Sequence, residues 1–271
     1  MSARFAARDR AALAALAAAA LLACAGCAQH GNGSQTLVFG RNKDAVKLDP
    51  AVATDGMSLN VARATMEGLT QYSPGSFDIR PWLATSWTLS PDGRTWTFVL
   101  RHNVKFQDGT DFDATAVKTN IDRWRLKDDP LHVQLKGDYS YYQDQFGGLP
   151  GVIKDVRVLA PDKVQIVLTK PVAPMLANFA MPAFAMSSPA AMKSRGADYF
   201  REPVGTGPYE VTDWVKDDHI TLKAYDGYWG AKPRIQTVIL RDIPDPSSSL
   251  IALQKGEIDG WEYPQPNDLP L

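Results

Sequence analysis

The sequence predicts an α/β fold of mixed α+β type, and three observations support this class. Apolar residues make up 45% and charged residues 22% of the chain, as is typical of globular proteins. Short runs of β-branched and aromatic residues, bounded by Pro and Gly turns, predict several strands. Helical apolar spacing occurs between these runs without regular βαβ alternation, which argues against a barrel or a dinucleotide-binding fold.

The composition also excludes several classes of protein. With 29 Lys and Arg against 30 Asp and Glu, the net charge is −1, so the basic excess usual for nucleic-acid binding is missing. The apolar content excludes wholesale disorder. After residue 30, no uncharged apolar run approaches the roughly 20 residues of a bilayer-spanning helix. We therefore expect a globular domain with no nucleic-acid partner.

The first 30 residues follow the order of a secretory signal. An apolar run at 11–23 is too short for a comfortable bilayer span, and small residues follow it. The positive start that precedes this run consists of Arg4, Arg8 and Arg10. We therefore expect residues 1–26 to be a signal peptide that is removed.

Cys27 has the position of a lipidated cysteine. Ala25 and Gly26 precede it as in a bacterial lipobox, whose thiol is diacylated and becomes the mature N-terminus. Cys24 offers a competing frame, although the small residues favour Cys27. Several acyl chains anchor a protein stably where one does not. Residues 27–35 would then tether the domain to a membrane, and no cysteine remains for an internal disulfide.

The first predicted elements are a buried strand at 36–40 and a helix. The turn Asp55-Gly56-Met57-Ser58 can cap this helix, whose apolar spacing continues to Leu69, with Gly68 near its end.

An antiparallel unit follows. Strands at 82–89 and 95–101 are joined by the turn Ser90-Pro91-Asp92-Gly93, where Pro presets one dihedral angle and Gly supplies a positive φ. The segment 104–109 closes the unit, and Asp113 is a predicted N-cap for the next helix. Trp82, Trp87 and Trp96 are expected in the core.

The second half continues with alternating strands and short helices. The predicted elements are hairpins at 152–159 with 163–168 and at 209–215 with 220–224, a helix near Ala173, a strand within 233–241, a Ser-capped helix at 247–255 ended by Gly256, and a strand at 258–261. We expect the strands at 36–40, 209–215, 220–224 and 235–241 to form one sheet, separate from the sheet that contains 95–101.

Several phrases, in order along the chain, match one family. They are Leu48-Asp49-Pro50, Glu67-Gly68-Leu69, Leu83 to Trp87, Ser90 to Phe98, Val104 to Gly109, Pro203 to Tyr209, Tyr225 to Gly230 and Leu253 to Asp259. With this series the chain resembles the family 5 extracytoplasmic solute-binding proteins, the dipeptide, oligopeptide and nickel receptors of ABC importers.

The resemblance implies a receptor of the type II periplasmic-binding-protein kind, in which two lobes close over a peptide or other small solute. The closed form would be presented to a permease and, through it, to ATPase subunits. Residues 36–70 and 200–271 would form the first lobe, and 71–199 an inserted α+β accessory domain. The family's second main lobe is absent from these 271 residues. The resemblance thus implies a C-terminally truncated member that encloses its solute poorly and binds it weakly.

Eight residues are candidates for contact with the solute. A loop that caps a helix can offer free N–H groups to a carboxylate, although plain capping explains Asp55, Gly56, Met57 and Ser58 equally. The rigid turn Gly205, Thr206 and Gly207 offers backbone donors, and a tight link between domains is the alternative. Tyr263, with Trp261, lies where the cleft is expected, unless both only pack. Tyr139, Tyr141 and Tyr142 form either an aromatic rim or a solvated loop.

An enzymatic constellation is not found. The four His residues include His30 in the tether, and the other three, His102, His132 and His219, lie far apart. No metal-ligand spacing, cysteine cluster or nucleophile elbow is present. We therefore expect no cofactor, no metal and no catalysis, and a periplasmic or cell-surface location at the lipid anchor. Two alternatives stay open: a lipoprotein scaffold or chaperone-like binder, and a receptor for nickel or another small solute.

Overall fold

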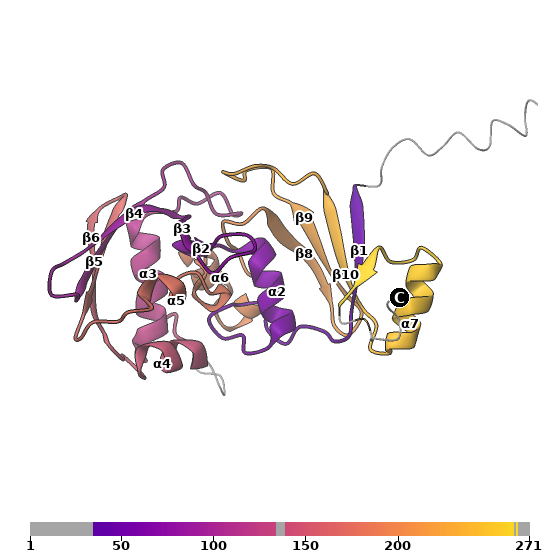
Figure 1. Cartoon of the computed structure of the whole chain (residues 1–271), viewed down its shortest axis with the longest axis horizontal. Coiled ribbons are helices and arrows are strands. Elements are labelled where there is room, and N and C mark those ends of the chain that lie inside the picture. Colours follow the sequence, from indigo (N-terminus) through magenta and orange to yellow (C-terminus); the bar gives the residue numbers. More distant parts are fainter. Residues whose placement is uncertain (1–34, 134–138, 263, 265–271) are drawn as a thin grey trace, which may run out of the picture. The chain divides into compact units, whose positions relative to one another are not determined.

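A computed structural model describes residues 35–133, 139–262 and 264 (Figure 1). The predicted signal peptide, Cys24, Cys27 and Tyr263 lie outside these described residues. Within them, no helix combines the length and apolar character that a bilayer crossing requires.

A five-stranded sheet gathers segments from both ends of the chain, in the order β11-β1-β10-β9-β8. Strand β1 runs parallel to β10 and β11, whereas β9 is antiparallel to β10 and to β8. The strands span Thr36–Arg41 (β1), Tyr209–Val215 (β8), His219–Ala224 (β9), Thr237–Asp242 (β10) and Gly260–Trp261 (β11). The predicted membership of this sheet is therefore confirmed, although β10 begins later than the pattern indicated.

Helix α2 (Gly56–Thr65) packs on this sheet and begins as predicted. Val61 joins Ile220 and Leu222 in a small buried cluster. The helix ends four residues before Leu69, because the backbone turns to an extended conformation at Met66. Gly68 is therefore no helix C-cap. A Cβ at Gly68 would lie 2.1 Å from the carbonyl oxygen of Phe179, so this position needs glycine for a close backbone contact.

A separate four-stranded antiparallel sheet has the order β4-β5-β7-β6. Its strands span Ala84–Leu89 (β4), Thr95–Leu100 (β5), Ile153–Ala160 (β6) and Lys163–Leu168 (β7). Helix α3 (Ala114–Arg125) contacts β6 and β7, and the Asp113 carboxylate accepts a hydrogen bond from the Ala116 N–H, as its N-cap role predicts. The two predicted hairpins of this sheet are thus confirmed, while the domain boundaries stay a prediction.

Several short elements lie outside the two larger sheets. They are β2 (Thr70–Tyr72), β3 (Ile79–Pro81), α4 (Ser140–Phe146), α5 (Met175–Asn178), η2 (Pro182–Phe184), α6 (Pro189–Arg195) and η3 (Gly196–Phe200). The β2–β3 pair was not predicted. Tyr139 and Tyr142 are 1% and 2% exposed and belong to the core, so they form neither an aromatic rim nor a solvated loop. Tyr141 of α4 is only partly buried and lines a cavity, as the rim hypothesis expects. Of the three tryptophans expected in the core, Trp96 is buried, whereas Trp82 and Trp87 are only partly buried.

Helix α7 (Pro246–Gln254) differs from its prediction at the start. Its N-cap is Asp245, whose carboxylate accepts hydrogen bonds from the N–H groups of Ser247 and Ser248. The serines are therefore donors within the first turn and not the cap. Gly256, with a φ of 71°, follows the helix as the pattern indicated.

Candidate functional site

An aromatic cavity of about 590 Å³ lies where α2 ends, beside β2 and the segment before α6. Its aromatic lining consists of Tyr72, Trp82, Tyr141 and Tyr228. Small-molecule sites are concave, mostly apolar and aromatic, with a few placed polar groups. This cavity has that character, and we take it as the candidate solute site.

Glu67 is the polar centre of the cavity wall. Its carboxylate accepts four hydrogen bonds, two at each oxygen. Oε1 accepts from Trp82 Nε1 at 2.7 Å and Tyr228 Oη at 2.8 Å, and Oε2 accepts from Trp229 Nε1 at 2.7 Å and Thr206 Oγ1 at 2.8 Å. Burial raises the pKa of Glu67 above its ordinary value, and these donated hydrogen bonds oppose the rise.

The donors to Glu67 are held in place by one another. The rings of Trp82 and Trp229 meet edge to face with centroids 5.2 Å apart. The guanidinium of Arg101 lies 4.2 Å from the ring centroid of Trp229 and donates a hydrogen bond of 3.0 Å to the Trp82 carbonyl. Three segments far apart in the sequence, at residues 82, 206 and 228–229, therefore converge on one buried carboxylate.

The turn of Gly205, Thr206 and Gly207 packs against the end of α2. Cβ atoms at the two glycines would lie 2.4 Å from the Thr65 oxygen and 2.5 Å from the Thr65 carbonyl carbon. The Gly205 N–H donates to Gln107 Oε1 at 2.8 Å, and the Gly207 N–H donates to the Thr65 carbonyl at 3.0 Å. Both glycine N–H groups are thus already bonded within the protein. Ligand contact by this turn stays a prediction, and the contact that the structure shows is from Thr206 to Glu67.

The residues of the capping turn have contacts of their own. Asp55 Oδ1 accepts from the Ser58 N–H at 2.9 Å, and Asp55 Oδ2 accepts from the Ser58 hydroxyl at 2.6 Å. Met57 and Ser58 are buried, and open space surrounds the position of a Cβ at Gly56. None of the four lines the aromatic cavity, although Leu59 does. Capping accounts for these contacts, and contact with a solute stays a prediction.

Neither Glu67 nor Tyr228 was predicted as a site residue, and Trp82 was expected only in the core. Glu67 was noticed only as part of a family phrase. A usable signal was present, because Glu67 stands between Met66 and Leu69 in an apolar stretch, where an unpaired charge is costly to bury. The sequence could not indicate the partners, which come from residues 82, 206, 228 and 229.

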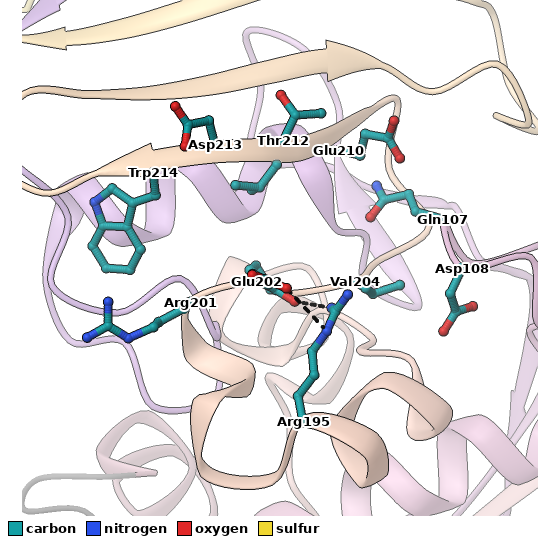
Figure 2. A pocket seen from close by; sticks show the side chains of 12 residues that line it. Gln107, Asp108, Arg195, Arg201, Glu202, Val204, Glu210, Thr212, Asp213 and Trp214 are labelled. Carbon is teal, nitrogen blue, oxygen red and sulfur yellow. Dashed lines mark hydrogen bonds and ion pairs between the residues drawn. The ribbon is translucent and has the colours of Figure 1, made fainter.

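A second cavity, of about 470 Å³, has a charged lining (Figure 2). Five consecutive residues at 210–214 of β8 line one side, and the segment at 201–204 lines another. Arg195 Nε lies 3.6 Å from Glu202 Oε2, and Trp214 Nε1 donates to Asp44 at 3.1 Å. Because most of its lining residues are charged or polar, this cavity fits the apolar pattern of a solute site less well.

A metal centre is not apparent in the part of the chain that the structure describes. No group of three or more His, Cys, Asp or Glu side chains there could hold an ion.

A family model and curated relatives of this chain point to the same protein family. The family model described as bacterial extracellular solute-binding proteins, family 5 middle, matches residues 78–271. The dipeptide-binding protein of Escherichia coli K12 is 34% identical over 248 residues, which are 87% of this chain and 46% of that protein. The glutathione-binding protein GsiB of Escherichia coli K12 is 36% identical over 220 residues, which are 81% of this chain and 40% of that protein.

Solved structures agree with these relatives. The periplasmic binding protein DppA of Helicobacter pylori, in complex with the peptide STSA, matches with a TM-score of 0.77 and 33% identity, over 82% of this chain and 45% of that chain. NikA of Brucella suis, in complex with Fe(III)-EDTA, matches with a TM-score of 0.69 and 33% identity, over 82% of this chain and 42% of that chain. The chain thus spans less than half the length of these relatives.

Proposed function

Because the chain belongs to family 5 of the bacterial extracellular solute-binding proteins, we propose that it is part of the solute receptor of an ABC importer. In this proposal it captures dipeptide-like peptides and delivers them to a membrane permease with its ATPase subunits. It has no catalytic activity, and it works in the periplasm or at the cell surface, held by a lipid at Cys27.

The main observation that supports the proposal is the aromatic cavity, in whose wall the Glu67 carboxylate already accepts four hydrogen bonds. Peptides offer apolar side chains and a polar backbone, which suit a wall of Tyr72, Trp82, Tyr141 and Tyr228. The dipeptide-binding relative and the peptide-bound DppA structure support the same solute class. The first lobe and the accessory domain, as divided at residues 70 and 200, would each contribute lining residues.

A metal chelate is the second candidate solute. The similarity to NikA in complex with Fe(III)-EDTA and to NikZ in complex with Ni(L-His) favours it. Since the described residues hold no group of three or more His, Cys, Asp or Glu able to bind an ion, they would contact the chelator and not the metal itself.

Titration of the purified protein distinguishes these solutes. A mixed dipeptide library, and separately a nickel–histidine chelate, would be added while backbone amide signals are followed by NMR, which detects weak binding. We expect saturable shifts from dipeptides at residues that line the aromatic cavity. Saturable shifts from the chelate alone would favour the second candidate, and no shift from either solute would contradict both.

A cavity-filling variant locates the binding site. Met181 lines the cavity and is partly buried, so Met181→Trp should fill the space and remove the shifts. The matched control is Val158→Trp at a position that is 42% exposed on β6 and does not line the cavity. Dipeptide binding that survives Met181→Trp would place the solute elsewhere.

A further inference from the structure

The aromatic cavity has two charged residues in its lining, Glu67 and Arg63. A carboxylate has about four lone-pair sites, and Glu67 already accepts four hydrogen bonds. Its capacity is used within the protein, so Glu67 has no acceptor site left for a cationic group of a solute. The charge that remains available to a solute is the guanidinium of Arg63.

Arg63 is placed at the cavity by α2. It lies one helical turn after Leu59, which also lines the cavity, so the two side chains share one face of the helix. Arg63 Nη1 donates to Asn60 Oδ1 at 3.1 Å, and Asn60 Nδ2 donates to Glu262 Oε1 at 2.9 Å. This amide orients the guanidinium without neutralising it.

Most N–H groups of Arg63 form no hydrogen bond to the described residues. A guanidinium has five N–H groups in a planar fork that matches a carboxylate, and one hydrogen bond from Arg63 is found among the described residues. No carboxylate in the described part of the chain lies within ion-pair distance of it. The neighbouring cations differ, because Arg80 and Arg101 lie over the rings of Trp82 and Trp229 and do not line the cavity.

We infer that Arg63 selects solutes with a free carboxylate, and that the cavity holds the apolar part of the same molecule against its aromatic wall. This inference rests on the proposed function and names the solute class more narrowly. The carboxylate pairs with the Arg63 guanidinium at the rim, while a side chain such as that of a C-terminal Phe enters between Trp82 and Tyr141. Arg63 is thus a specificity-determining residue of the cavity.

The test compares one peptide in two forms. The dipeptide Ala-Phe and its C-terminal amide are titrated into the whole protein, and the dissociation constants come from the NMR shifts of cavity residues. We expect the free acid to bind about tenfold more tightly or better, which is the effect of one charge-assisted hydrogen bond. Arg63→Gln should abolish this difference by weakening the acid alone, and Arg63→Lys should retain part of it.

A matched control and the contrary outcomes make the test decisive. Arg157→Gln removes an exposed arginine of β6 that does not line the cavity, and it should leave both constants unchanged. If the unaltered protein binds both forms equally, or if Arg63→Gln weakens both equally, the inference is wrong although the proposed function stands. If neither form binds, the proposed function fails, and the inference fails with it.

Discussion

Glu67 shows how a residue that is costly to bury can organise its surroundings. A buried carboxylate without partners would lose far more free energy than a few hydrogen bonds return. Here four donors surround it, and three of them are the polar atoms of aromatic side chains, from Trp82, Tyr228 and Trp229. The carboxylate therefore fixes the orientation of rings that form or support the cavity wall.

Substitution of Glu67 should therefore destabilise the protein. In Glu67→Gln, an amide NH₂ faces two donors that can no longer bond to it, and we expect a loss of about 1–3 kcal/mol in the free energy of unfolding. Urea unfolding followed by tryptophan fluorescence measures this loss. The control is Glu257→Gln, whose carboxylate is 46% exposed and lies 3.7 Å from Arg241, and which should change stability by about 0.5 kcal/mol or less. An equal effect of both substitutions would contradict the role given to Glu67.

At the scale of elements, local sequence patterns predicted the strands and two helix N-caps correctly, but they did not predict where α2 ends. Asp55 and Asp113 cap their helices as predicted, because a capping hydrogen bond depends on residues three positions apart. The end of α2 was missed, since it is set by the packing of residues 66–68 against Phe179 and the turn at Gly205. Helix α4 was not predicted either, because its position depends on tertiary packing: Tyr142 in its first turn is buried in the core.

The contact of Gly68 can be tested by adding one methyl group. In Gly68→Ala the new Cβ would lie 2.1 Å from the Phe179 carbonyl oxygen, so the backbone must shift. We expect a loss of about 1–3 kcal/mol in the free energy of unfolding, as for overpacking of a core.

The matched control for this substitution is a glycine with open space around it. Gly56→Ala adds a methyl group where no atom lies within 4 Å, at the first residue of α2. Because Ala is the better helix former, this change should be neutral or slightly stabilising. Both variants are compared by their urea unfolding midpoints. Equal midpoints would show that the close approach at Gly68 is relaxed at no cost.

At the scale of the whole molecule, the described residues form a five-stranded sheet, a four-stranded sheet and the small β2–β3 pair. The five-stranded sheet combines residues 36–41 with residues 209–261, so the chain leaves this sheet and returns to it. The four-stranded sheet lies within the excursion. The insertion of an accessory domain into a first lobe stays a prediction, and the aromatic cavity draws its lining from residues 59–70, 71–185 and 208–228.

Anchoring of the whole molecule is tested at its N-terminus. If Cys27 is lipidated, the mature protein should fractionate with membranes and carry a mass increase on Cys27, because several acyl chains bind a bilayer stably. Cys27→Ser should release the protein from membranes, and Cys24→Ser should leave its fractionation unchanged. A lipid on Cys24 would show that the other frame is used, and an unmodified N-terminus would contradict anchoring.

The sequence by itself determined the family, the secondary structure of the two larger sheets and the starts of α2 and α3. Each of these depends on local spacing or on the order of short phrases, which can be read along one dimension. Only the tertiary structure showed the aromatic cavity, the four hydrogen bonds that Glu67 accepts and the N–H donors that Arg63 leaves for a solute. The reason is physical: the burial of one carboxylate is balanced by donors 15 to 162 residues away, and no local pattern specifies which distant side chains will meet it.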